Sequence, residues 1–175
     1  GFNTIDIGSL TNDSILIMII LMFIGASPGS TGGGVKTTSG AILFLLIWNR
    51  LKGSEHVNVF NRTIPNETVT KTISIIFASA FSVVLITSFL LFAQSSGLPP
   101  DRSRHFFLEY LFEAVSAFGT VGLSMGVTPQ MNSAQKLATI LLMFAGRVGP
   151  LTFALALTLA SRKKSITYAK ETVMV

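Results

Sequence analysis

GASPGSTGGGVKTT, at residues 25–38, is the stretch that decides how this chain folds. An apolar run at residues 15–24 leads into it, and a second apolar run, residues 41–48, follows it. In a helix interior, each of its five glycines lowers helix stability by about 1 kcal/mol and its proline by about 3 kcal/mol. We therefore expect a helix that breaks inside this stretch and starts again after it.

The composition indicates a protein that resides in a membrane. Of its 175 residues, 49% are hydrophobic and 12% are charged, and the mean hydropathy is +0.62. Soluble domains carry about 25% charged residues. The long apolar runs predict an all-α integral membrane protein in contact with the lipid bilayer. The net charge of +5 comes from basic residues that flank these runs, so no nucleic-acid partner is expected.

The apolar runs beside the glycine-rich stretch are too short to cross a bilayer separately. As a helix, residues 15–24 reach about 15 Å, whereas a bilayer core is about 30 Å thick. Residues 15–24 and 41–51 therefore form one broken membrane-spanning unit. The backbone of such a break must be satisfied by protein or by a water-filled cavity.

Two longer apolar spans are predicted further along, at residues 73–92 and 137–159. The polar residues 53–72 connect the first unit to them, and residues 161–175 form a tail. Eight basic residues fall on the side of this connection and tail, and three fall on the opposite side. Basic residues are enriched on the cytoplasmic side, so we expect a multi-pass protein with the connection and C-terminus in the cytoplasm.

A short helix and a turn between these spans have the pattern of an ion pore. Residues 105–118 are apolar but too short to span, and they lead into the turn at residues 119–124, called the filter turn below. Backbone carbonyls at a glycine turn can replace the hydration oxygens of a cation. We interpret the turn as a filter rather than an ordinary extracellular loop. Its expected ion-binding residues are Thr120, Val121, Gly122 and Leu123.

The sequence contains an internal repeat with an offset of 121 residues. Gly1 aligns with Gly122, and LMFIG at residues 21–25 aligns with LMFAG at residues 142–146. The chain is therefore expected to begin inside a functional element, as a C-terminal fragment of a longer protein. A second filter position is predicted at Gly1, Phe2 and Asn3.

Arg147 is a charge inside a predicted membrane span, and the repeat aligns it with Ala26. A charge at the bilayer centre costs roughly 2.5–3.5 kcal/mol or more, so Arg147 needs a polar partner. We predict that it contacts carbonyls or hydroxyls of residues 25–38, anchors this segment below the filter and forms an electrostatic barrier. The alternative is an arginine that serves packing only.

Glu113 is an acid in the predicted pore helix, where a charge is expensive unless it is paired. Two interpretations remain open. Glu113 either bonds backbone amides behind the filter and holds it rigid, or it extends to the extracellular surface.

The glycine-rich stretch also has a nucleotide-binding interpretation, because it nearly matches GxxxxGK[ST]. Val35 adds one residue too many before the lysine, however, and no strand precedes the pattern. A mobile plug in an ion path fits better. We call residues 25–38 the gate loop, with Lys36 expected toward the cytoplasmic side. Its expected functional residues are Gly25, Pro28, Gly29, Ser30, Thr31, Gly32, Gly33, Gly34 and Lys36.

The sequence gives no sign of an enzyme. It has no cysteine, and His56 and His105 are isolated, without metal-ligand spacing. We expect no catalytic residue and no covalent cofactor, and K⁺ held by backbone carbonyls as the bound metal.

Residues 1–4, 25–38, 113–124 and 146–150 together resemble the Trk/Ktr/HKT superfamily of potassium transporters, most of all the membrane (KtrB-type) subunit of bacterial Ktr systems. The resemblance implies four membrane–pore-loop–membrane repeats around one pore. Residues 1–52 would hold the second half of the third repeat, and residues 73–160 the fourth. It further implies potassium uptake across the bacterial plasma membrane by a homodimer on a cytosolic ring of nucleotide-binding (RCK-type) regulatory subunits.

Two alternatives remain open. The first is a sodium or mixed monovalent cation channel or symporter of the same superfamily, in which a serine at a filter glycine tends toward sodium. Gly1 and Gly122 favour potassium, with a possible Na⁺ dependence. The second is a non-transporting membrane anchor or sensor, which would need neither a filter turn nor a buried Arg147.

Overall fold

The computed structural model describes residues 1–54, 57–59, 62–94 and 100–149, and at 58–59 and 100–105 it describes the backbone alone. Its described part is mostly α-helical, with one short antiparallel pair of strands. His56 and the predicted segments 150–159 and 161–175 lie outside the described residues. The elements are η1 (Ile7–Ser9), α1 (Asn12–Phe23), α2 (Thr37–Leu51), β1 (Asn58–Val59), β2 (Arg62–Thr63), α3 (Asn66–Gln94), α4 (Pro100–Gly119), η2 (Thr128–Gln130) and α5 (Ser133–Val148).

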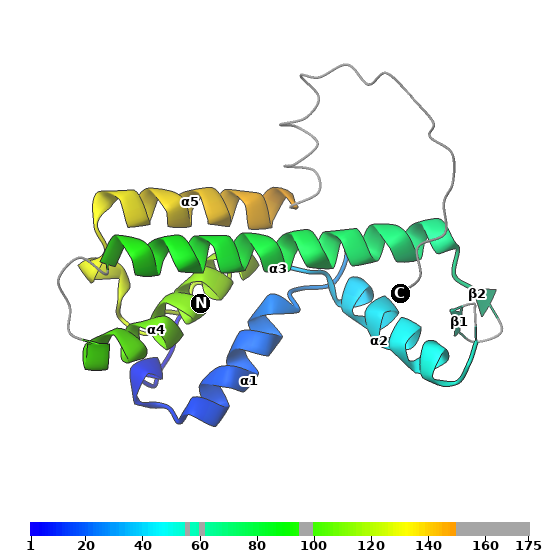
Figure 1. The fold of residues 1–175 in the computed structure, drawn as a ribbon, viewed down its shortest axis with the longest axis horizontal. Helices are drawn as coiled ribbons and strands as arrows, with labels where there is room; N and C mark the ends of the chain where they lie inside the picture. Colours follow the sequence, from blue (N-terminus) through cyan, green and yellow to red (C-terminus); the bar gives the residue numbers. More distant parts are fainter. Residues whose placement is uncertain (55–56, 60–61, 95–99, 150–175) are drawn as a thin grey trace, which may run out of the picture.

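Helix α3 forms the long axis of the molecule (Figure 1). Its 29 residues reach about 43 Å, enough to cross a bilayer, and among the described helices it is the one that is long and apolar enough to do so. It contains the predicted span 73–92 but begins at Asn66, inside the segment predicted as a connection. The added turns are polar yet compatible with a helix, since Lys71 bonds Glu67 one turn earlier at 2.6 Å.

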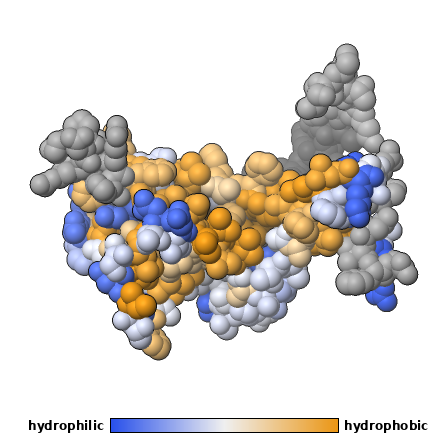
Figure 2. Space-filling model, turned by 90° about the horizontal axis from the view of Figure 1, so that it is seen from below, coloured by the Kyte–Doolittle hydropathy of each residue, from blue (hydrophilic) through white to orange (hydrophobic). Residues whose placement is uncertain are grey.

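Helix α3 buries polar as well as apolar side chains and exposes large aromatic ones. Its buried side chains include the hydroxyls of Ser79 and Thr87, whereas Phe77, Phe81 and Phe92 are exposed. Figure 2 shows hydrophobic residues over the middle of one face of the molecule and hydrophilic residues toward its two ends. Large exposed apolar surfaces mark contact with lipid or with other apolar protein.

Helix α4 is the centre of the fold, because it packs against α1, α3 and α5. Residues 112–119 are all buried, and Phe112 and Phe118 have no exposed surface. The predicted pore helix, residues 105–118, is therefore enclosed on all sides in its second half. Its carboxyl end, where the filter turn begins, is fixed by this packing.

The break between α1 and α2 is a closed loop. Ile24 and Val35 form a parallel bridge, in which the Gly25 amide donates to Val35 O at 2.7 Å and the Val35 amide donates to Phe23 O at 3.1 Å. Helix α2 already begins at Thr37, so the last two residues of the gate loop are helical. The bridge satisfies backbone groups that a break inside a membrane would otherwise leave unpaired.

A short 3₁₀ helix followed by an α-helix occurs near both ends of the described part. Helices η1 and η2 begin 121 positions apart, at Ile7 and Thr128, and α1 and α5 begin 121 positions apart, at Asn12 and Ser133. This spacing equals the offset of the predicted repeat.

Candidate functional site

Two residues of the filter turn, directly after α4, have positive φ angles. Thr120 has φ 52° and Gly122 has φ 90°. The Val121 amide donates to Ser116 O at 3.0 Å, and the Ser116 hydroxyl donates to Leu123 O at 2.6 Å. The turn is therefore folded back on the last turn of α4, and the carbonyl of Leu123, a predicted ion ligand, accepts a bond from protein.

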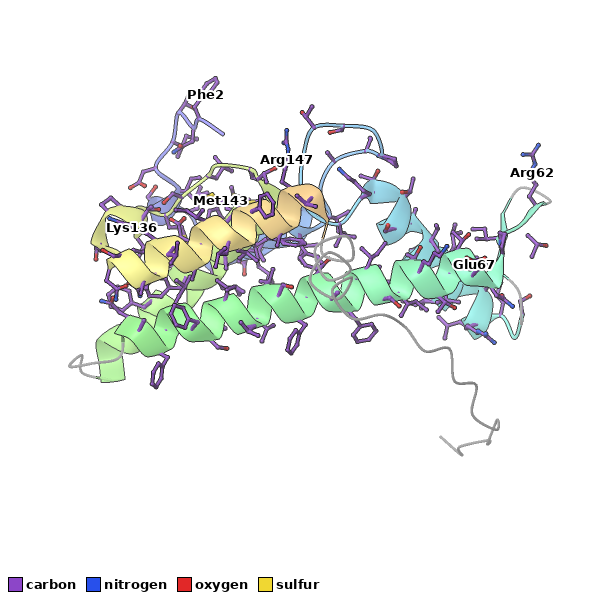
Figure 3. The ribbon with its side chains drawn as sticks, turned by 90° about the horizontal axis from the view of Figure 1, so that it is seen from above. Phe2, Arg62, Glu67, Lys136, Met143 and Arg147 are labelled. Atoms are coloured by element: carbon purple, nitrogen blue, oxygen red, sulfur yellow. The ribbon has the colours of Figure 1, made fainter. Side chains whose placement is uncertain are left out.

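Gly1 lies against Gly122, the residue with which the repeat aligns it. A Cβ added to Gly122 would be 3.5 Å from the Gly1 Cα, and one added to Gly1 would be 2.5 Å from Val121 O. The structure thus brings the two predicted filter glycines together. Phe2 is 94% exposed and its side chain points away from the body (Figure 3), and Asn3 is exposed and donates to Ile5 O at 2.6 Å.

Two cavities flank the filter turn, and Thr120 and Leu123 line both. One, of about 330 Å³, extends to Glu113 behind the turn. The other, of about 440 Å³, extends to Gly25 and Gly32 of the gate loop. The filter turn therefore separates a space beside its own helix from a space beside the gate loop.

Glu113 is 6% exposed, and its carboxylate faces the last residue of the filter turn and the segment after it. Its Oε1 accepts hydrogen bonds from the hydroxyls of Ser124 and of Thr128, the latter at 3.1 Å. Of the two interpretations of Glu113, the burial of its side chain favours the one in which it bonds groups at the filter turn over the one in which it extends to the surface. The predicted backbone amides are also replaced by hydroxyls, a role that sequence reasoning missed although both hydroxyls stand shortly after the glycine turn.

Within the gate loop, side chains hold the backbone in place. The Lys36 ammonium donates to Gly32 O at 2.6 Å, and the Gly32 amide donates to the Ser30 hydroxyl at 3.0 Å. The Lys36 side chain therefore folds back over the loop, and its predicted position toward the cytoplasmic side stays a prediction. Pro28 and Gly29 at its tip are exposed.

Two side-chain hydrogen bonds join the gate loop to the filter turn and to α5. The Gly33 amide donates to the Thr120 hydroxyl at 2.8 Å, and the Arg147 guanidinium donates to Thr31 O. Figure 3 shows Arg147 at the end of α5, beside the loop between α1 and α2. The Thr120 contact was not predicted.

Arg147 lies in the last turn of α5 rather than in the middle of a described helix, and Gly149 follows with φ 95°. A cation at this position is favoured by the partial negative charge of the helix end. Within the described residues, no three His, Cys, Asp or Glu side chains gather into a metal-binding cluster. The polar groups of the site are carbonyls and hydroxyls, together with the Arg147 guanidinium, the Lys36 ammonium and the Glu113 carboxylate.

Comparison with known proteins assigns this architecture to a class, the cation transport proteins. Residues 1–167 match the TrkH family, which carries that description, and the chain belongs to this family. Its members are integral membrane cation transporters rather than enzymes. The resemblance to the Trk/Ktr superfamily inferred from the sequence is thereby confirmed, including its Ktr type.

Three relatives illustrate the match. The chain is 38% identical to Ktr system potassium uptake protein B of Vibrio alginolyticus over 99% of its length, and 35% identical to Ktr system potassium uptake protein D of Bacillus subtilis over 100%. It is 32% identical to the potassium/sodium uptake protein NtpJ of Enterococcus hirae over 96%. The chain spans 36%, 37% and 36% of these relatives, little more than a third of their length.

Proposed function

We propose that this chain forms part of the ion path of a potassium-uptake transporter, with the filter turn and Gly1 in its filter and residues 25–38 as its gate. The observation that carries the proposal is the position of the gate loop. It bonds the filter turn through Gly33 and Thr120 and bonds α5 through Thr31 and Arg147. A glycine-rich loop held at an ion filter is placed to block the path or to open it.

The filter would act through backbone carbonyls. K⁺ gives up its hydration oxygens where carbonyl dipoles can replace them, and glycine adopts the required backbone at no steric cost. The positive φ of Gly122 and its approach to Gly1 support this role. Glu113 would hold the turn from behind through Ser124 and Thr128.

We propose that the chain carries one and a half pore repeats of a larger assembly. Residues 1–52 would be the second half of one repeat, and residues 73–160 a complete one. The common spacing of 121 positions between η1 and η2 and between α1 and α5 supports this division. Further repeats are needed to complete the filter, in line with the third of each relative that the chain spans.

Potassium is the ion we favour, because both visible filter positions are glycine and two relatives are named for potassium uptake. A sodium or mixed cation transporter is the second candidate, supported by the relative named for potassium and sodium uptake. Gly1 and Gly122 argue against it, since a serine is the replacement expected for sodium.

We further propose a multi-pass protein of the bacterial plasma membrane whose connection and C-terminus are cytoplasmic. Figure 3 shows Arg62 and Lys136 at opposite ends of the molecule, as this orientation requires. Because relatives are named as parts of Ktr systems, the chain is expected to belong to a membrane subunit, as a homodimer, on a cytosolic RCK-type regulatory ring.

Growth rescue tests the proposed function. The full-length protein, expressed with its regulatory subunit in bacteria that lack potassium uptake, is expected to restore growth on low potassium, and Gly122→Ser is expected to weaken it. Absence of rescue despite membrane expression would favour a non-transporting anchor or sensor. Rescue that requires sodium would favour the mixed transporter.

A further inference from the structure

Thr120 connects two parts of the chain that are 87 positions apart in sequence. Its hydroxyl accepts a hydrogen bond from the Gly33 amide at 2.8 Å, in a partly buried setting. Gly33 itself is buried, as is Val35, whose main chain closes the base of the gate loop. The bond therefore joins the filter turn to the inner part of the gate loop, not to its exposed tip.

The fit at this contact is close on both sides. A Cβ added to Gly33 would be 2.8 Å from the Thr120 Cγ2 and 2.9 Å from Phe118 O, nearer than real Cβ atoms come to such neighbours. The backbone of the gate loop thus rests directly on the end of α4 and on the Thr120 side chain. Any movement of the loop away from the filter turn must break the Gly33–Thr120 bond and this packing together.

The backbone of Thr120 is unusual as well. Among the described residues it is the one non-glycine residue with positive φ, at 52°. A β-branched residue rarely adopts this conformation, and such residues persist where the surroundings over-determine them. The bond to Gly33 is one of the contacts that would do so, so the state of the gate loop and the backbone of the filter turn are linked.

We propose that Thr120 is a positioning residue that latches the gate loop to the filter turn, a second attachment besides Arg147. This inference rests on the proposed function, because it assigns how the proposed gate is held closed. The two attachments are separable: Arg147 holds Thr31 from α5, whereas Thr120 holds Gly33 from the filter turn. If Arg147 were the sole anchor, removal of the Thr120 hydroxyl would leave the loop unchanged.

The test uses the full-length protein, with any cysteine outside this chain replaced, so that one introduced cysteine serves as reporter. This chain contains no cysteine, and Ser27 is exposed in the gate loop, so Ser27→Cys places a thiol there. Thr120→Val keeps the shape and the β-branch but removes the acceptor, whereas Thr120→Ser keeps the hydroxyl. We expect Thr120→Val to raise the rate of maleimide labelling at residue 27 roughly two- to tenfold, as loss of one hydrogen bond allows. Thr120→Ser should label like the parent.

A second variant tests the latch from the loop side without changing the filter turn. Gly33→Ala places a methyl group against Thr120 and Phe118, so it should lift the loop and raise labelling in the same way. Gly40→Ala is the matched control, because its added methyl meets only the Ile24 Cγ2, at an ordinary 3.4 Å. It should label like the parent.

Transport gives a second readout. A released gate is expected to raise the maximal potassium uptake rate of Thr120→Val above that of the parent and of Thr120→Ser. Unchanged labelling in both Thr120→Val and Gly33→Ala would overturn the latch, as would a Thr120→Ser variant that behaves like Thr120→Val. Labelling does not require transport, so a protein that carries no potassium but shows the labelling pattern would contradict the proposed function and retain the latch.

Discussion

The guanidinium of Arg147, in the last turn of α5, donates a hydrogen bond to the main-chain oxygen of Thr31 in the gate loop. The two residues are 116 positions apart in the sequence, and Thr31 lies outside the helices and strands. A charged donor makes this bond stronger than one between neutral groups. It ties the loop to a helix that packs on α3 and α4.

Replacing Arg147 should loosen the gate. Arg147→Ala removes a charged hydrogen bond and the positive charge at the proposed ion path, so we expect the potassium uptake rate of the full-length protein to rise about tenfold. Lys136→Ala, at the exposed start of the same helix, is the control and should leave the rate unchanged. An Arg147→Ala variant with the parent's rate and ion preference would contradict the anchoring role.

A serine at Gly122 should shift the ion preference. The added side chain is strained at φ 90° and would point toward the Gly1 Cα, so the filter carbonyls cannot keep their arrangement. We expect potassium affinity to fall about tenfold or more and the sodium-to-potassium uptake ratio to rise. Gly126→Ser is the matched control, with φ 89° and open space around it. Equal effects of both variants would show strain rather than filter chemistry.

Glu113 should contribute to stability through the two hydroxyls that donate to it. Glu113→Ala removes the acceptor of two hydrogen bonds, from the half-buried Ser124 and the exposed Thr128, and at about 0.5–1.5 kcal/mol for each bond this costs about 1–3 kcal/mol. Thermal unfolding in detergent should therefore occur at a lower temperature, and Glu113→Gln, which keeps an acceptor oxygen, should lose less. Glu67→Ala breaks an exposed pair with Lys71 and should change stability by less than about 1 kcal/mol. Similar losses for Glu67→Ala and Glu113→Ala would contradict this role.

Gln135 joins α5 to Leu90 of α3 and to Tyr110 of α4, whose hydroxyl accepts from its amide at 3.4 Å, so an apolar residue of similar size should destabilise the protein. Gln135 has no exposed surface, its amide donates to Leu90 O at 2.8 Å, and its oxygen accepts from the Asn132 amide at 2.8 Å as part of a capping box. Gln135→Leu would leave the Asn132 amide without its acceptor and remove the bond to Leu90 O, so we expect a loss of about 1–3 kcal/mol in unfolding experiments. Gln130→Leu, at an exposed site in η2, should change little. A Gln135→Leu variant as stable as the parent would show that the network is not needed.

Local backbone features could be predicted from the sequence. Glycine and proline disfavour helix strongly enough to predict both the break between α1 and α2 and the turn after α4. The aligned repeat also predicts that Arg147 approaches the gate loop, and the structure shows this contact. The repeat aligns Gly1 with Gly122 but did not predict that the two glycines lie against each other. What these contacts do in transport remains a prediction.

The boundaries and the polar partners could not be predicted. Hydropathy marks the apolar part of α3 but not its polar first turns, so its start at Asn66 was missed. The bond between Thr120 and Gly33 depends on how closely the end of α4 approaches the gate loop. The pattern of apolar residues in the sequence carries no information about this distance. Glu113 likewise accepts hydrogen bonds from hydroxyls and not from the predicted backbone amides because of the path that the chain takes around the end of the filter turn.

The most direct test of a gate in the ion path is the potassium uptake rate of the full-length protein after deletion of residues 29–34. The deletion removes Thr31 and Gly33, and with them both attachments of the loop, while it keeps Ile24 and Val35 at the loop's base. If the loop closes the path, uptake per protein in the membrane rises well above that of the parent. An unchanged or lower rate, with the same amount of protein in the membrane, would contradict the gate.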